Sequence, residues 1–197
     1  RAAARLLFAL VGMLPRVQGV QRLPQRPCVV VSNHGSYLDG AIVVAALARP
    51  CVFVAKDELR RQPVAGSYLR RLGTLFVERF AADRAMAEAT AMAEAVERGA
   101  SIIVFPEGTF AGEPGLLPFH LGAFLAAARA GAPVVPVAIR GSRDALPDGS
   151  WWPRHAPLQV DVCDAIEPAA GMEPFASAVQ LREKARRAIA ARLAPGS

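Results

Sequence analysis

A histidine and an aspartate five positions apart are the clearest chemical signal in this chain. Asn33-His34 follows the apolar run Val29–Val31, and Asp39 comes five residues after His34. An imidazole suits proton transfer near neutral pH, and a carboxylate that holds one ring nitrogen leaves the other to act as a base. A continuous helix would place side chains at this spacing about 140° apart, so a loop must pair them, with Gly35 giving the backbone freedom. The alternative is that His34 caps a loop and Asp39 caps the next helix.

A second polar cluster follows another apolar run. Glu107-Gly108-Thr109 comes directly after the strand-like segment Ser101–Phe105 and Pro106. A carboxylate and a hydroxyl beside a glycine, which allows close backbone approach, can position a small polar acceptor. Such residues gather where strands of an open α/β sheet end. We therefore expect Glu107, Gly108 and Thr109 to lie near His34 and to form the acceptor side of one site.

Two cations complete the candidates. Lys56 stands at the end of the apolar run that begins at Cys51, and Arg79 closes the segment that begins at Gly73. A guanidinium suits a phosphate because its fork of donors matches two oxygens at once. The alternative for Arg79 is a surface salt bridge with Glu78 or Asp83.

Four segments resemble the motifs of the glycerolipid acyltransferases, in particular the lysophosphatidic acid acyltransferase family. They are Asn33-His34 with Asp39, Gly73-Thr74-Leu75-Phe76-Val77-Glu78-Arg79, Phe105-Pro106-Glu107-Gly108-Thr109 and Val135-Pro136-Val137-Ala138-Ile139-Arg140-Gly141. The resemblance implies that His34 and Asp39 form a catalytic dyad. His34 would deprotonate the hydroxyl of a lysophospholipid, which attacks the thioester of acyl-CoA or acyl carrier protein directly, with no bound cofactor. It also implies that Arg79 binds the acceptor phosphate, while Asn33, Lys56, Glu107, Gly108 and Thr109 line the substrate site.

Two departures from this family weaken the prediction of a phosphate acceptor. Phe110 stands where the family commonly has a basic residue, and His120 where it often has lysine. The alternatives for the acceptor are glycerol-3-phosphate and a lysolipid without phosphate, such as an amino-acid-derived lipid. The alternative to an enzyme is an inactive membrane-binding module. Ser32 or Ser36 as an acylated nucleophile is disfavoured because the chain has no G-x-S-x-G elbow.

The composition favours a lipid surface or a phosphorylated ligand over nucleic acid. The net charge is +6, aromatic residues are only 7%, and no nucleic-acid-binding motif is present. The three cysteines are scattered as in a reducing compartment, and no zinc-binding spacing predicts a metal. We expect a protein on the cytoplasmic face of a membrane, bound peripherally or monotopically.

The N-terminal residues are expected to contact that membrane. No apolar run reaches the roughly 18 residues that span a bilayer. Leu6 to Leu14 is apolar and flanked by arginines, so within residues 1–20 we predict an interfacial helix. A helix packed on the core and a signal peptide are the alternatives. Because the sequence does not begin with methionine, we expect it to be part of a longer chain.

Alternating apolar runs and helical segments predict one domain over residues 1–197 with an α/β fold, in which helices cover both faces of a mostly parallel sheet. Strands are expected at Cys28–Val31, Cys51–Ala55, Gly73–Arg79, Ser101–Phe105, Val134–Ile139 and Leu158–Val162, and helices at Asp39–Leu47, Asp83–Arg98, Pro118–Gly131 and the C-terminus.

Pro136 suggests an edge or a bulge, and Leu158–Val162 is predicted as an edge strand. Asp83 is expected to cap its helix. The apolar side of the C-terminal helix is predicted to hold Phe175, Ala178, Leu181, Ala185 and Ile189.

Overall fold

Short runs of β-branched residues form the centre of the molecule because such side chains pack well on a pleated sheet. The residues of β2 (Val29–Ser32) and β5 (Ile102–Val104) are all buried. The structure, a computed structural model, describes residues 2–47, 49–62, 66–67, 70, 74–77, 82–109, 115–150 and 152–194.

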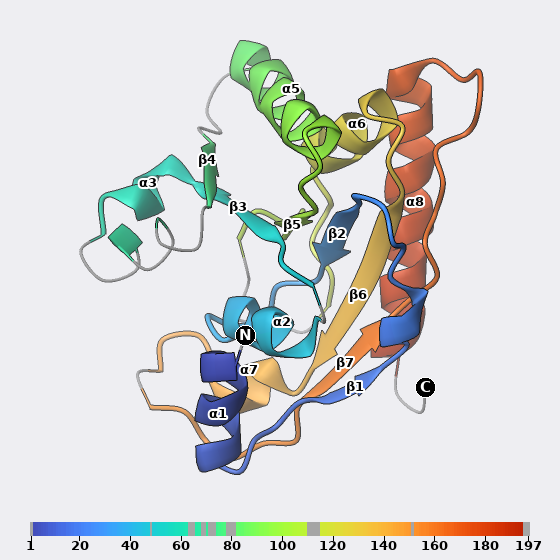
Figure 1. Cartoon of the computed structure of the whole chain (residues 1–197). Coiled ribbons are helices and arrows are strands. Elements are labelled where there is room, and N and C mark those ends of the chain that lie inside the picture. The colour runs from blue at the N-terminus through green and yellow to red at the C-terminus, as the bar shows by residue number, and fades with distance from the viewer. Residues whose placement is uncertain are drawn as a thin grey trace.

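The other elements alternate along the chain (Figure 1). The remaining strands are β1 (Arg16–Gln18), β3 (Val52–Lys56), β4 (Leu75–Val77), β6 (Val134–Arg140) and β7 (Gln159–Val162). The helices are α1 (Ala2–Leu10), the short 3₁₀ helix η1 (Val20–Arg22), α2 (Asp39–Ala46), α3 (Asp57–Arg60), α5 (Ala82–Glu97), α6 (Gly122–Arg129), α7 (Ser142–Ala145) and α8 (Pro174–Leu193).

Seven strands form one sheet in the order β1-β7-β6-β2-β5-β3-β4. Every neighbouring pair is parallel except β6 with β7, which run antiparallel. This confirms the predicted α/β fold with a mostly parallel sheet. The strand ends that carry the candidate site residues therefore meet at one edge of the sheet.

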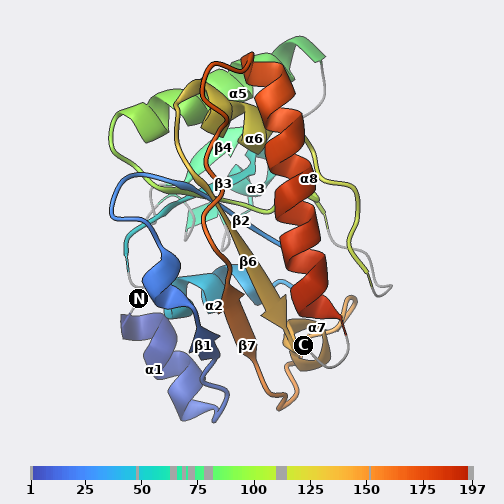
Figure 2. The ribbon, with the colours of Figure 1, turned by 90° about the vertical axis from the view of Figure 1, so that its right-hand side faces the viewer.

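Alternate residues of each strand pack against helices on opposite faces. Val29 and Val31 of β2 join a core cluster with α5, α6 and α8, whereas Val30 joins a second cluster with α1 and α2. Figure 2 shows α8 on one side of β6 and β7, with α1 and α2 on the other. Burial of both faces is why these strands read as continuous apolar runs in the sequence.

The prediction of an edge strand at Leu158–Val162 is wrong. The strand β7 pairs with β6 on one side and with β1 on the other, so β1 is the outer strand at this end of the sheet. The strand Arg16-Val17-Gln18 has only one apolar residue and is shorter than the roughly four to eight alternating residues that predict a strand.

Pro136 lies in a central strand, not at an edge or in a bulge. It pairs in register with Val31 of β2, and its carbonyl oxygen accepts a hydrogen bond from the Cys163 N–H on the other side. The N–H that proline lacks would face the same side, where β7 has already ended at Val162. The β6–β7 hydrogen-bond ladder therefore ends at the residue that lacks a donor, so the proline removes no ladder hydrogen bond there.

Three expected helix features differ from the structure. The helix expected from Pro118 begins at Gly122, and Asp83 is the second residue of α5 instead of its cap. Along α8, Ala178, Leu181, Ala185 and Ile189 are buried as predicted, but Phe175 is 56% exposed. The α8 cap is Glu173, whose carboxylate accepts hydrogen bonds from the backbone N–H groups of the next turn.

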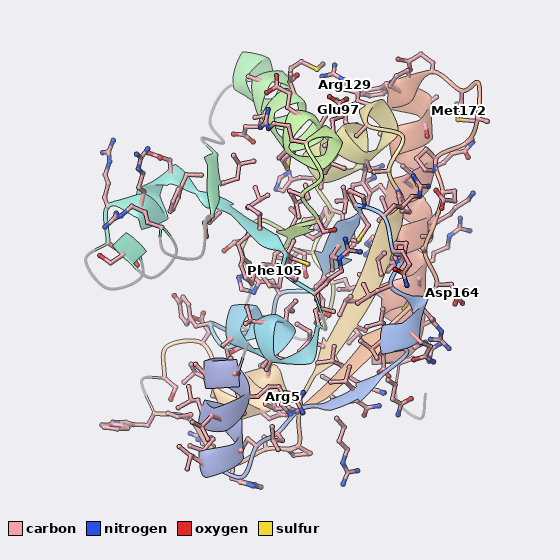
Figure 3. The ribbon with its side chains drawn as sticks, in the orientation of Figure 1. Arg5, Glu97, Phe105, Arg129, Asp164 and Met172 are labelled. Atoms are coloured by element: carbon pink, nitrogen blue, oxygen red, sulfur yellow. The ribbon has the colours of Figure 1, made fainter. Side chains whose placement is uncertain are left out.

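The N-terminal helix both packs on the core and exposes leucines. Phe8 is buried against α2, and Arg5 donates a hydrogen bond to the Ala45 carbonyl oxygen near the end of α2 (Figure 3). Leu7 and Leu10 are 58% and 76% exposed. No helix within the described residues combines the length and apolar content needed to cross a bilayer.

Candidate active site

The site lies at the edge where β2, β5 and β3 end. The segment 33–39 leaves β2, the segment 105–109 leaves β5, and Lys56 is the last residue of β3. In the sheet, β5 lies between β2 and β3. Neighbouring strands are about 5 Å apart, so the backbone of Lys56 lies roughly 10 Å from β2 across the sheet.

His34 and Asp39 are paired. Their Nδ1 and Oδ2 atoms lie 3.0 Å apart, with the Asp39 side chain fully buried and that of His34 21% exposed. The same carboxylate oxygen accepts hydrogen bonds from the N–H groups of Gly35 and Ser36 at 2.7 and 2.8 Å. The turn therefore wraps around the carboxylate, and bonds to an ionised acceptor are the strong ones.

The structure agrees with the paired interpretation and contradicts the alternative, because no side chain caps the N-terminus of α2. Asp39 is the first residue of α2 and contacts both the imidazole and the backbone of the preceding turn. Gly35 does not have a positive φ, so the turn does not need glycine for a left-handed backbone there. What Gly35 contributes is its N–H, which any residue other than proline could supply.

Asn33 fixes the start of this turn to the neighbouring strand. Its side-chain amide donates to the Ile139 carbonyl oxygen at 2.9 Å, and its side-chain oxygen accepts from the Ile139 N–H at 2.8 Å. The amide thus continues the ladder between β2 and β6 by one residue beyond Ser32. Both ends of the Asn33 amide are used within the fold, and the residue is only 8% exposed.

Glu107 braces two backbone segments. Its Oε1 accepts from the His34 N–H at 2.8 Å, and its Oε2 accepts from the Leu117 N–H at 2.7 Å. Burial raises the pKa of the Glu107 carboxyl, and the two backbone hydrogen bonds oppose that rise. The residue is only 4% exposed. Its position next to His34 agrees with the expected grouping, but its oxygens face backbone donors.

The ring of Phe105 packs against the face of the His34 imidazole. Its ring stacks on that of His34, with centroids 4.4 Å apart and an interplanar angle of 22°. Figure 3 places Phe105 between β5 and α2. The sequence analysis missed this contact, although the position of Phe105 at the end of a strand beside β2 is a signal that could have indicated it.

The two serines of the His34 loop are poor candidates for an acylated nucleophile. Ser36 is fully buried, and its hydroxyl donates to the Leu146 carbonyl oxygen at 2.9 Å while accepting from the Leu38 N–H at 3.2 Å. Ser32 is also fully buried, within β2. Ser36 therefore ties the loop to the residue that follows α7.

The structure gives fewer details for the remaining predicted residues. Gly108 has a φ of 74°, and its N–H donates to the Phe105 carbonyl oxygen in a tight turn. Thr109 and His120 are exposed. Arg79 and Phe110 lie outside the described residues. Within the described part of the chain no cluster of histidine, cysteine, aspartate and glutamate side chains is arranged to hold a metal ion.

Comparison with known proteins identifies the family. The sequence model of the family described as Acyltransferase matches residues 15–140, which is more than half of the chain. The chain belongs to this acyltransferase family. The resemblance inferred from its four motifs is thereby confirmed.

Similar proteins of the acyltransferase family include enzymes with two kinds of acceptor. A chloroplastic 1-acyl-sn-glycerol-3-phosphate acyltransferase, BAT2 of Brassica napus, is 36% identical over 150 residues, covering 73% of this chain and 43% of the relative. A lyso-ornithine lipid O-acyltransferase of Pseudomonas aeruginosa is 39% identical over 145 residues, covering 74% and 54%. The chain thus spans about half the length of these relatives.

A solved structure of the family has the same fold. The crystal structure of the 1-acyl-sn-glycerophosphate acyltransferase PlsC from Thermotoga maritima aligns with a TM-score of 0.79 and 27% sequence identity. The alignment covers 98% of this acyltransferase-family chain and 78% of that one. The likeness therefore extends over the whole sheet and its helices.

Proposed function

We propose that this chain transfers an acyl group from a thioester to the free hydroxyl of a lysophospholipid, in phospholipid biosynthesis. The observation that carries the proposal is the His34–Asp39 pair, in which a fully buried carboxylate holds Nδ1 of a partly exposed imidazole. A free alcohol is a poor nucleophile at neutral pH, and a positioned base contributes about 10²–10⁴-fold to the rate.

The proton would move through His34 in both directions. As the acceptor oxygen attacks the thioester carbonyl carbon, its proton passes to Nε2, because Asp39 holds Nδ1. The negative charge of Asp39 stabilises the resulting imidazolium. When the tetrahedral intermediate collapses, the carbon–sulfur bond breaks and the imidazolium returns the proton to the leaving thiolate. No acyl-enzyme forms, and acyl-CoA or acyl carrier protein is the donor.

The proposed acceptor is a lysophosphatidate, and a lysolipid without phosphate is the second candidate. A relative that acts on lyso-ornithine lipid is 39% identical, and Phe110 replaces a basic residue common in the family. Arg79 and Lys56 are the proposed contacts for an acceptor phosphate, and Gly108 and Thr109 the proposed wall beside it. For Asn33 and Glu107, the hydrogen bonds to backbone favour a role in holding His34 in place.

Thiol release from palmitoyl-CoA tests the proposal. The wild type is assayed with lysophosphatidate, lyso-ornithine lipid and glycerol-3-phosphate, beside His34→Ala, Asp39→Asn and the remote surface variant Arg98→Gln. We expect His34→Ala and Asp39→Asn each to lose about 10²-fold or more in kcat, with Arg98→Gln unchanged. Near-normal turnover by His34→Ala would refute the dyad. Vesicle binding without any thiol release by the wild type would favour an inactive membrane-binding module.

We also propose that the protein binds the cytoplasmic face of a membrane peripherally through α1. Leu6, Leu7 and Leu10 are all more than half exposed, while Phe8 anchors the helix to the core. Transfer of each leucine into the interface would contribute up to about 1.5–3 kcal/mol. The double variant Leu7→Gln/Leu10→Gln should sediment at least about 10-fold less well with anionic vesicles, whereas Phe175→Gln, an equally exposed apolar site on α8, should sediment normally.

A further inference from the structure

A cation that the sequence analysis did not single out lies against the His34 loop. Arg143 is in α7, the short helix that follows β6. A Cβ atom placed on Gly35 would lie 3.8 Å from Nε of Arg143 and 3.9 Å from its Cβ. The stem of Arg143 therefore runs alongside the residue that directly follows His34.

The turn before α7 directs the arginine to this place. Gly141 has a φ of 81°, and a Cβ there would lie 1.9 Å from the Pro157 carbonyl oxygen. Only glycine fits both the backbone conformation and the space, so the chain turns sharply from β6 into α7.

Hydrogen bonds hold both ends of this segment to the His34 loop. Before α7, Ile139 is bonded to the Asn33 amide through its N–H and its carbonyl oxygen. After α7, the Leu146 carbonyl oxygen accepts from the Ser36 hydroxyl. Arg143 lies between these two ties, so its backbone is fixed relative to His34.

The Arg143 guanidinium has no internal partner within the described residues. In contrast, Arg140 pairs with Asp161 at 2.9 Å. Oδ2 of Asp39 accepts three hydrogen bonds, its buried Oδ1 has no hydrogen-bond partner among the described residues, and Glu107 accepts two backbone N–H groups, so neither carboxylate pairs with Arg143. Arg143 is a half-buried residue beside the His34 loop, and a guanidinium there with no carboxylate partner is suited to bind an oxyanion from outside the chain.

We propose that Arg143 binds the anionic headgroup of the acceptor lipid, a phosphate or a carboxylate. This rests on the proposed function. The acceptor headgroup is only a few bonds from the hydroxyl that His34 would deprotonate. The phosphates of CoA are separated from the thioester by the whole pantetheine arm, so a cation beside His34 meets the acceptor anion and not CoA.

Acceptor kinetics of Arg143→Gln and Arg143→Lys test the proposal, with Arg98→Gln on the opposite side of the sheet as the control for loss of one charge. Lysophosphatidate, lyso-ornithine lipid and uncharged monoacylglycerol are the acceptors, with palmitoyl-CoA as donor. We expect Arg143→Gln to raise the KM for at least one of the two charged lysolipids by about 10-fold or more, and Arg143→Lys to raise it less. The KM for palmitoyl-CoA and turnover of monoacylglycerol should not change. The charged lysolipid with the larger rise identifies the headgroup.

Three outcomes would overturn the role of Arg143. They are a raised KM for palmitoyl-CoA, an equal loss of kcat with all three acceptors, and kinetics like those of Arg98→Gln. A binding measurement separates this proposal from the proposed function, since calorimetric titration of short-chain lysophosphatidate and lyso-ornithine lipid needs no turnover. Binding by His34→Ala but not by Arg143→Gln supports the headgroup contact even if the wild type releases no thiol. Equal binding by both variants refutes it.

Discussion

Replacement of Glu107 should separate a brace from a substrate contact. Its two oxygens accept the backbone N–H groups of His34 and Leu117, which come from loops 83 residues apart. Glu107→Ala leaves both donors without an acceptor, whereas Glu107→Gln keeps one acceptor oxygen and turns an NH₂ group toward the other donor. If Glu107 is a brace, the two variants should differ in stability, and both should misplace His34.

The expected magnitudes follow from the number of unpaired donors. A buried donor that loses its acceptor costs about 1–3 kcal/mol. Both N–H groups are partly buried. Burial also raises the pKa of the carboxyl, which means that the buried charge is unfavourable. Removing that charge in either variant therefore offsets part of the loss of stability. We therefore expect the free energy of unfolding to fall by about 2–4 kcal/mol in Glu107→Ala and by about 1–2 kcal/mol in Glu107→Gln.

The effect of pH on these variants has a definite sign. Because the pKa of folded Glu107 is raised above its ordinary value of 4.5, the folded protein holds a proton that the unfolded chain has lost in the window just above 4.5. The contribution of this residue to stability is thus greatest below that window and falls as pH rises through it. Urea unfolding of wild type and Glu107→Gln from pH 4 upward should show the wild type losing stability relative to the variant.

Kinetics decide between the two roles for Glu107. A displaced base lowers kcat, and a misplacement of about 1 Å can cost roughly 10²-fold, while acceptor binding is largely kept. We expect Glu107→Gln to lower kcat at least about 10-fold with less than about a threefold change in the acceptor KM. A raised KM with normal kcat and normal stability would show that the carboxylate contacts the acceptor, and the reasoning from its hydrogen bonds would be refuted.

Three further substitutions test the supports of the site. Asn33→Ala should lower the free energy of unfolding by about 2–4 kcal/mol in urea titration, because two backbone groups of β6 lose partners; an unchanged midpoint would contradict this. Phe105→Leu should lower kcat about 2- to 10-fold at constant KM through loss of the stack on His34, and an unchanged kcat would show that the stack is dispensable. Gly141→Ala should destabilise more than Gly149→Ala in thermal unfolding, by about 1–3 kcal/mol. Both glycines have positive φ, but only Gly141 faces a carbonyl oxygen at 1.9 Å; equal losses would show that the contact relaxes.

The sequence alone predicted what depends on local pattern. The runs Val29–Val31 in β2 and Ile102–Val104 in β5 are apolar at every position, so both their strand character and their burial could be read directly. The alternation of strands and helices predicted a parallel sheet. In such a sheet the strand ends that carry Glu107 and His34 meet at one edge, so their proximity was predicted too. The spacing of His34 and Asp39 also indicated correctly that a turn would pair them.

Contacts between distant segments could not be predicted in the same way. The Asn33 amide bonds to Ile139, which is 106 residues away, and the Ser36 hydroxyl bonds to Leu146, which is 110 residues away. Neither partner has a side chain that signals such a role, because each bond uses a main-chain group. The outer strand β1 was missed for a similar reason: it is held by register with β7 and not by its own apolar pattern.

The reliance of the site on main-chain partners has a consequence for specificity. Asn33, Ser36 and Glu107 hold the His34 loop through backbone groups, so the side chains of Ile139, Leu146 and Leu117 can change without loss of those bonds. The base can therefore stay fixed while neighbouring side chains vary. Acceptor preference is then determined by residues that lie beside the His34 loop but do not hold it in place. Arg143 is such a residue, since its stem contacts the loop while its charge has no internal partner within the described residues. A change of acceptor class should accordingly require substitutions on α7 before any in the turn around Asp39.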